Sequence, residues 1–378
     1  MAAIFDSIIQ YIFGTSQECF AEDLNSMEEI CVALFQDVTT EPGYCIVNIL
    51  RVPDEYAVKG QQIVLSEDIA DRDTLSLASF EGENQNTNEF KKETDNTISE
   101  KKTDNMSVKM KSVGAIVCDG VRGTVFRVGS KYVMTALHVV LSITNPAKRQ
   151  NIPDNDWTKL EDPNVWIMFA PSATDLQSPP FHIKRDVIFL NKELDIAILE
   201  LKPGKKLPGK LNLSKDMGIT EHVDLIGFGH PIDAGKCWDP NCRIVPVTCD
   251  LIQSLQWQHS QFVEKCSLRT ILQLHGLNPN MLEMNKCYAE LQNSDRFACH
   301  IVMEHGASGA PAIADNEVVG VLVKGVPLYY YALKNRIPTA QYVQHFPSHL
   351  RFELCTRADR MYEVIRCENP MLTADLFN

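Results

Sequence analysis

The strongest constraint on the fold is a long succession of short apolar runs that begins after Ser112. Gly, Asn, Asp and Pro separate the runs, which read GAIVCDG, GTVFRVGSKYVMTAL, NVWIMFA, DVIFL, LDIAILEL, HVDLIGFG, HIVME and PAIADNEVVGVLVKG. Many short strands with turn residues between them are typical of an antiparallel sandwich or barrel. This part of the chain is therefore predicted to be mainly β, with a C-terminal helix over residues 348–367. The candidate packing residues of that helix are Leu350, Leu354, Met361, Val364 and Ile365.

The segment from Glu81 to Ser112 separates two regions of different character. It is rich in Asn, Thr, Lys and Glu, has few apolar residues and shows no regular period. Such a composition cannot bury enough surface to offset the entropy lost on ordering. We expect a flexible polar linker over residues 81–112, between an N-terminal module of residues 1–80 and a larger unit of residues 113–378.

The N-terminal module opens with apolar residues at helical spacing and continues with an apolar run, CIVNILRVP, typical of a strand. A helix packed on its own small α+β domain is the favoured interpretation. A helix that binds a protein partner or a membrane surface remains an alternative, although the absence of Lys and Arg from its opposite face weakens the membrane version. We expect this module to regulate or target the rest. The apolar positions are Ile4, Phe5, Ile8, Ile9 and Ile12.

Charge and the first residues exclude some classes of partner. The net charge of −13 argues against binding nucleic acid through a generally basic surface. The opening MAAIFDSIIQYIF has no basic residue before its apolar stretch, and it is too short and too polar to span a bilayer. We therefore expect no transmembrane segment and an intracellular protein, cytoplasmic or nuclear. Its 12 cysteines are then expected to be mostly reduced thiols.

Three local motifs carry the chemistry. His138 ends the run MTALH, where small residues before it would place the imidazole at a strand end facing a cleft. Asp195 opens the apolar run DIAILEL, and a carboxylate there must be hydrogen-bonded because burying it unpaired is costly. Ser308 lies in HGASGAP, where two glycines permit a tight turn that exposes a hydroxyl beside converging N–H groups.

Each motif alone has a plainer interpretation: a structural histidine, an acid in a turn, and a Ser/Gly loop. Together they are stronger, because they occur in the order His, Asp, Ser. That order belongs to the chymotrypsin arrangement and differs from the orders of subtilisin and of the α/β-hydrolases. The three residues are therefore candidates for one catalytic triad.

At these points the sequence resembles the trypsin-like serine protease family. TALHV resembles its Thr-Ala-x-His motif, LDIAILEL its Asp-Ile-Ala-Leu motif, and GASGAP its Gly-x-Ser-Gly-x-Pro motif. The last form is closest in style to intracellular and Deg/HtrA-type members. The resemblance covers residues 114–338.

The resemblance implies a chymotrypsin-like double antiparallel β-barrel with the active cleft between the barrels. His138 and Asp195 would come from the first barrel and Ser308 from the second. His138 would take the proton of Ser308 and return it to the leaving amine, while Asp195 would fix the tautomer of His138. The loop of Gly306, Ala307 and Ser308 would form the oxyanion hole through the N–H groups of its first and last residues. No cofactor is implied.

Two departures from the family bear on activation and specificity. Secreted members carry an Asp before the nucleophile that pairs with a newly cut amino terminus, and this chain has Ala307 there. Members that cleave after Lys or Arg carry an acid six residues before the serine, where this chain has Val302. The expected pocket wall, Val323-Lys324-Gly325, has no acid either. An apolar side chain is therefore expected at P1, the substrate residue that precedes the cut bond.

Three further interpretations concern the rest of the chain. His230, Cys237, Cys242 and Cys249 have one spacing within the zinc range, but free cysteines are the favoured interpretation, and no metal is assigned. A catalytically inactive protease-fold binding or scaffold protein is the alternative function. The linker is expected to be cut by the protein itself, after Phe90 or, failing that, near Met106 or Met110.

Overall fold

In the computed structural model, the described residues are 97–118, 121–145, 156–172, 180–216, 218, 220–230, 233, 235–301, 303, 305–338 and 340–378. They belong to one compact unit, residues 92–378. The N-terminal module of residues 1–80 and the preferred cut site at Phe90 lie outside the described residues, as does Val302.

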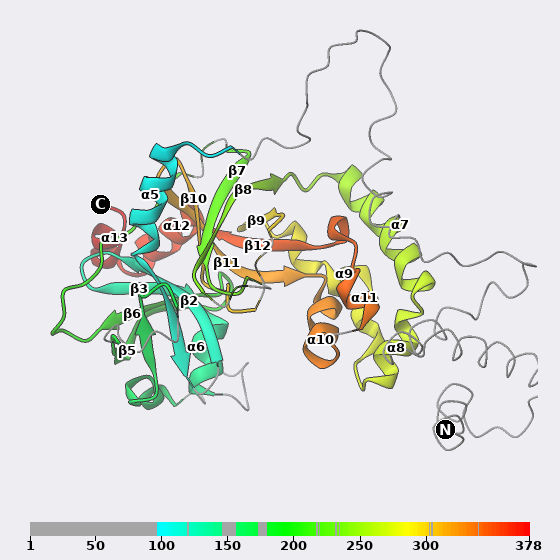
Figure 1. The fold of residues 1–378 in the computed structure, drawn as a ribbon, viewed down its shortest axis with the longest axis horizontal. Coiled ribbons are helices and arrows are strands. Elements are labelled where there is room, and N and C mark those ends of the chain that lie inside the picture. Colours follow the sequence, from blue (N-terminus) through cyan, green and yellow to red (C-terminus); the bar gives the residue numbers. More distant parts are fainter. Residues whose placement is uncertain are drawn as a thin grey trace, which may run out of the picture. The chain divides into compact units, whose positions relative to one another are not determined.

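The first sheet has six antiparallel strands in the order β4-β1-β2-β3-β6-β5 and forms a half-barrel (Figure 1). Every residue of β6, the strand between β3 and β5, is buried. The helix α6 (Leu137–Thr144) follows β3 without a loop and packs its apolar side chains into the same core. The strands are β1 (Val113–Cys118), β2 (Val121–Val128), β3 (Tyr132–Ala136), β4 (Trp166–Met168), β5 (Ile183–Asn191) and β6 (Ile196–Leu201).

The second sheet is a closed antiparallel barrel in the order β10-β11-β12-β9-β8-β7. Pairing between β7 and β10 closes it, so these strands leave no unpaired edge. A half-barrel beside a closed barrel of six strands is the chymotrypsin-like double-barrel fold, which confirms the predicted fold class. The strands are β7 (His222–Gly227), β8 (Cys237–Val245), β9 (Arg296–Cys299), β10 (Pro311–Ala314), β11 (Glu317–Val326) and β12 (Phe352–Arg357).

A group of helices, largely inserted between β8 and β9, packs beside the second barrel (Figure 1). It has its own apolar core, in which Leu255, Leu272 and Tyr329 are buried. The strand pattern on which the fold prediction rests gives no indication of this group. The elements are α7 (Cys249–Lys265), α8 (Leu268–Leu274), α9 (Met284–Cys287), α10 (Leu328–Arg336) and α11 (Gln341–Gln344), with 3₁₀ turns η3 (Pro279–Leu282) and η4 (Ala289–Gln292).

The predicted helix over residues 348–367 is wrong in its first half. A 3₁₀ turn, η5 (Ser348–Leu350), leads into strand β12, and α12 (Ala358–Glu368) begins only afterwards. Leu350 and Leu354 have helical spacing, but pairing with both β11 and β9 draws residues 352–357 into the barrel. The chain then ends in α13 (Pro370–Leu376), whose Asp375 accepts hydrogen bonds from the amide and hydroxyl of Ser130.

The predicted flexible linker over residues 81–112 is helical in its described part. Helix α5 (Glu100–Met110) starts at Ser99, whose hydroxyl caps it by accepting from the amide of Lys102. Lys102 forms an ion pair of 3.0 Å with Asp224 of β7, and Met106 is buried in the main core. These contacts with the barrel supply the stabilisation that the polar composition lacks.

One further 3₁₀ turn, η2 (Trp157–Glu161), lies between α6 and β4. Among the helices of the described residues, none combines the length and the apolar character that crossing a membrane requires.

Candidate active site

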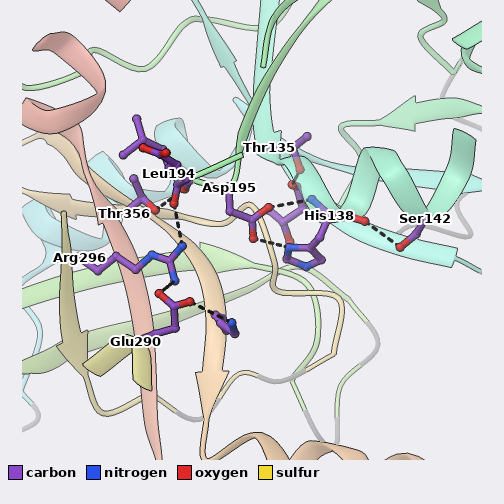
Figure 2. A network of polar contacts seen from close by, with 11 residues as sticks. Thr135, His138, Ser142, Leu194, Asp195, Glu290, Arg296 and Thr356 are labelled. Carbon is purple, nitrogen blue, oxygen red and sulfur yellow. Dashed lines mark hydrogen bonds and ion pairs between the residues drawn. The ribbon is translucent and has the colours of Figure 1, made fainter. Parts of the chain in front are cut away.

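His138 and Asp195, which are 57 residues apart in the sequence, are in direct contact (Figure 2). His138 lies in the first turn of α6, immediately after β3. Its Nδ1 is 2.7 Å from Oδ2 of Asp195, and its backbone N–H donates to Oδ1 at 2.9 Å. Because an ionised carboxylate only accepts hydrogen bonds, Nδ1 carries the proton and Nε2 is left as a base.

Asp195 ends the tight turn between β5 and β6. Its φ is 57°, a left-handed conformation that is unusual for a residue with a side chain. Its carbonyl oxygen accepts from the amide of Leu137, the residue before the histidine. Backbone and side chain of Asp195 therefore both bind the start of α6, and the carboxylate is anchored from two directions.

Ser308 lies in the loop between β9 and β10, which presses against the first sheet. Gly309 has a φ of 91°, and a Cβ there would overlap the carbonyl oxygen of Thr124 and the hydroxyl of Thr135. Its amide donates to the carbonyl of Leu322, at 2.7 Å, which ties the loop to β11. Only glycine fits this close approach, so the residue after the serine is fixed by the packing of the two sheets.

Thr124 of β2 fastens the serine loop, a role that no sequence motif predicts. Its amide donates to the carbonyl of Ser308 at 2.8 Å, and its hydroxyl donates to the carbonyl of Gly306 at 2.7 Å. The same hydroxyl accepts from the amide of Phe228, at 3.1 Å. No local signal marks this threonine, because its partners lie more than a hundred positions further along the chain.

The three residues predicted to form the oxyanion hole, Gly306, Ala307 and Ser308, lie in the loop between β9 and β10. Gly306 has a φ of 99°, and neither its N–H nor that of Ser308 donates a hydrogen bond within the described part of the chain. The side chain of Ala307 between them is buried in the core of the second barrel. The N–H groups of Gly306 and Ser308 are therefore not used in hydrogen bonds within the described residues.

His138, Asp195 and Ser308 line one cleft with a volume of about 1270 Å³. His138 remains 45% exposed at its side chain, so a substrate can reach the imidazole. No hydrogen bond joins the side chains of His138 and Ser308 in the described residues. In unliganded active sites this contact is often long and shortens when substrate binds.

The predicted specificity residues Val323, Lys324 and Gly325 lie along the same cleft. The structure adds an acid that no sequence motif indicates: Glu353 of β12, which pairs with Gly325 in the barrel. Its carboxylate accepts a hydrogen bond from the hydroxyl of Tyr331, whose ring packs against Gly325. Burial, and next the charge of Glu353, raise the pKa of Tyr331 well above its ordinary value, so the phenol stays protonated and donates.

A second group of charges lines the cleft near the Asp195 turn. Glu290 binds Arg296 through an Nη1–Oε2 contact of 2.9 Å and approaches Lys324 at 3.5 Å. Burial acts to raise the pKa of Glu290, but Arg296 and Lys324 outweigh it and hold that pKa below its ordinary value. The carboxylate therefore stays ionised and keeps the guanidinium of Arg296 in place.

The cysteines with a spacing typical of zinc sites lie on two elements. Cys237 and Cys242 lie on β8 and Cys249 starts α7. Burial raises the pKa of the Cys242 thiol, which disfavours the thiolate that a metal needs. Among the described residues, no group of three or more His, Cys, Asp or Glu side chains could hold a metal ion, and the nine cysteines there are free thiols.

No family model and no curated protein sequence matches this sequence. Among solved structures, the chain is similar to the active form of the Rv3671c protease from M. tuberculosis, with 16% identity, coverage of 69% of this chain and 82% of that chain, and a TM-score of 0.37. It is also similar to the scabies mite inactivated protease paralogue S-D1, with 14% identity, 71% and 95% coverage, and a TM-score of 0.39. These similarities are low, and the fold assignment rests on the sheet topology described above.

Proposed function

We propose that this chain is a serine endopeptidase in which Ser308 is the nucleophile, His138 the general base and acid, and Asp195 the group that orients the histidine. The observation that carries this proposal is the direct Nδ1–Oδ2 contact between His138 and Asp195 at the edge of the cleft that also contains Ser308. A histidine with a carboxylate on one nitrogen is set up to use the other as a base.

The proposed reaction proceeds through an acyl-enzyme. Nε2 of His138 takes the proton from Oγ of Ser308 as that oxygen attacks the substrate carbonyl. The N–H groups of Gly306 and Ser308 stabilise the negative oxygen of the tetrahedral intermediate. His138 then gives its proton to the leaving amine, and a water molecule deprotonated by the same nitrogen releases the acyl group from the serine.

We propose that the cleft prefers an apolar P1 side chain, although the acid Glu353 lines it. Glu353 is only 5% exposed, and its carboxylate already accepts a hydrogen bond from the hydroxyl of Tyr331. Leu328 and Tyr331 also line the cleft. A buried cation would have to displace the Tyr331 hydrogen bond, whereas an apolar side chain would leave it intact.

Replacement of each triad residue tests the assignment. Ser308→Ala and His138→Ala are each expected to lower kcat for peptide hydrolysis on the order of a thousandfold or more, with the fold retained. Asp195→Asn is expected to lose about as much, because it favours the wrong tautomer of His138. Hydrolysis by Ser308→Ala at the wild-type rate would exclude Ser308 as the nucleophile.

A further inference from the structure

The turn that carries Asp195 belongs to the first sheet, yet the second barrel holds it (Figure 2). The hydroxyl of Thr356 donates to the carbonyl of Leu194 at 2.7 Å, and Nη2 of Arg296 donates to the carbonyl of Glu193 at 3.1 Å. These are the two residues immediately before Asp195. The two peptide planes that lead into the aspartate are thus fixed by side chains from another part of the fold.

The two donors are neighbours in the second barrel. Thr356 of β12 and Arg296 of β9 are directly opposite one another in the strand pairing. Thr356 is fully buried, and the side chain of Arg296 is 6% exposed. Glu290 holds the guanidinium by its ion pair with Arg296, and its carboxylate is itself bound by Lys324 and accepts a hydrogen bond from the side-chain amide of Asn293.

The geometry of the turn makes Asp195 sensitive to this support. A left-handed backbone conformation is costly for a residue with a Cβ, so it persists only where surrounding contacts fix it. Both carboxylate oxygens of Asp195 bind His138, and a rotation of the preceding peptide would displace them together. Ser308 is carried by the same barrel as the two donors. The contacts of Thr356 and Arg296 therefore fix the position of Asp195 and His138, in the first sheet, relative to Ser308 in the second barrel.

We infer that Thr356 and Arg296 are positioning residues for the catalytic apparatus, acting through the backbone of Asp195, with Glu290 holding Arg296 in place. The inference rests on the proposed function for its kinetic consequences. Its structural part, that these side chains keep Asp195 on His138, stands independently of catalysis.

Thr356→Val tests the first contact, since valine has the shape of threonine without the hydroxyl. We expect kcat to fall about tenfold or more with little change in KM, because misplacement of catalytic groups acts on the chemical step. Thr356→Ser, which keeps the hydroxyl, is expected to retain activity near that of the wild type. Thr373→Val is the matched control: it removes a buried hydroxyl that donates to the carbonyl of Asn369, the residue before α13, and it should leave kcat unchanged.

Glu290→Gln tests the second contact without removing a barrel side chain. The matched control is Glu200→Gln, because Glu200 also bridges two basic residues, Lys131 and Lys184, but lies on β6 outside the cleft. We expect kcat to fall in Glu290→Gln and to stay unchanged in Glu200→Gln. This variant also keeps the inference testable if Thr356→Val does not fold.

Two readouts separate a positioning role from a general loss of stability. In an Asp195→Asn background, Thr356→Val should cause no further loss of kcat, because its effect passes through the aspartate. In proton NMR of the full chain, the Nδ1 proton that His138 shares with Asp195 should be visible in the wild type and weakened in Thr356→Val and Glu290→Gln. This signal needs no turnover, so it decides the inference even if the wild type hydrolyses nothing, an outcome that would count against the proposed function alone. An unchanged proton signal together with an unchanged kcat in both Thr356→Val and Glu290→Gln would overturn the inference. It would also be overturned if Thr356→Val lowered kcat by the same factor in the wild type and in the Asp195→Asn background.

Discussion

Gly309→Ala tests whether the serine loop is held by its close approach to the first sheet. The new methyl group would overlap the carbonyl oxygen of Thr124 and the hydroxyl of Thr135, and it would lie 3.1 Å from the amide nitrogen of Ala136. The φ of 91° adds backbone strain for any residue other than glycine. Strain of this kind costs about 1–3 kcal/mol, and overpacking against backbone typically costs about 1–3 kcal/mol more.

We therefore expect Gly309→Ala to lower the free energy of unfolding by about 2–6 kcal/mol and to displace the serine loop, with loss of hydrolysis. Urea unfolding measures the first effect and should be done in a Ser308→Ala background, which prevents self-digestion. The control is Gly276→Ala, since Gly276 has a φ of 64° but a methyl group added there would have no atom within 4 Å. It isolates the backbone strain, about 1–2 kcal/mol. Equal losses of stability in the two variants would refute the close-approach argument.

Three other predictions concern pH, specificity and self-cleavage. Burial lowers the pKa of His259 to about 4, so as the pH falls the unfolded chain takes up a proton before the folded chain does. The free energy of unfolding, measured by urea titration, should therefore decline by about 3 kcal/mol between pH 6.5 and pH 4. A pH dependence that His259→Gln leaves unchanged would contradict this. A peptide library should be cut mainly after Phe, Tyr, Leu or Met; cutting after Lys or Arg that disappears in Glu353→Gln would show that the buried acid selects a basic P1 residue. Incubated wild type, but not Ser308→Ala, should show by intact mass a cut after Phe90 and none at Met106, which is buried in α5; equal nicking in both proteins would exclude self-cleavage.

The sequence is informative where a motif and its structural surroundings are adjacent in the chain. Asp195 directly precedes β6, in agreement with its expected place at the start of a strand. His138, expected at a strand end, lies instead in the first turn of α6, two residues after β3. The succession of short apolar runs with turn residues between them likewise predicts the mainly β fold. The prediction of a double barrel depends on the resemblance of the three motifs, taken together, to the trypsin-like family.

Other features depend on partners far away in the chain, and no local pattern predicts them. Leu350 and Leu354 have the spacing of a helix, yet β9 and β11 make the segment around Leu354 a strand. Helix α5 forms in a polar segment because Met106 finds a place in the core and Lys102 finds Asp224. These are cases in which tertiary contacts override local propensity.

The residues that support the site also depend on partners far away in the chain, so no local pattern predicts their role. The contact from Thr356 to Leu194 spans 162 positions, and that from Thr124 to Gly306 spans 182. A threonine in a strand has no sequence signature for such a task. The catalytic candidates could therefore be predicted from the sequence, whereas the side chains that hold them in register required the structure.

The most direct measurement of the central claim is labelling of the full chain by a fluorophosphonate, which reacts with an activated serine. Peptide mapping after labelling of the wild type is predicted to find the adduct on Ser308, with Ser308→Ala unlabelled and His138→Ala labelled far more slowly. Glu200→Gln, whose carboxylate lies outside the cleft, should label like the wild type. A folded wild type that takes up no label, or an adduct on another residue that persists in Ser308→Ala, would contradict the assignment of a serine endopeptidase and favour a protease-fold binding protein.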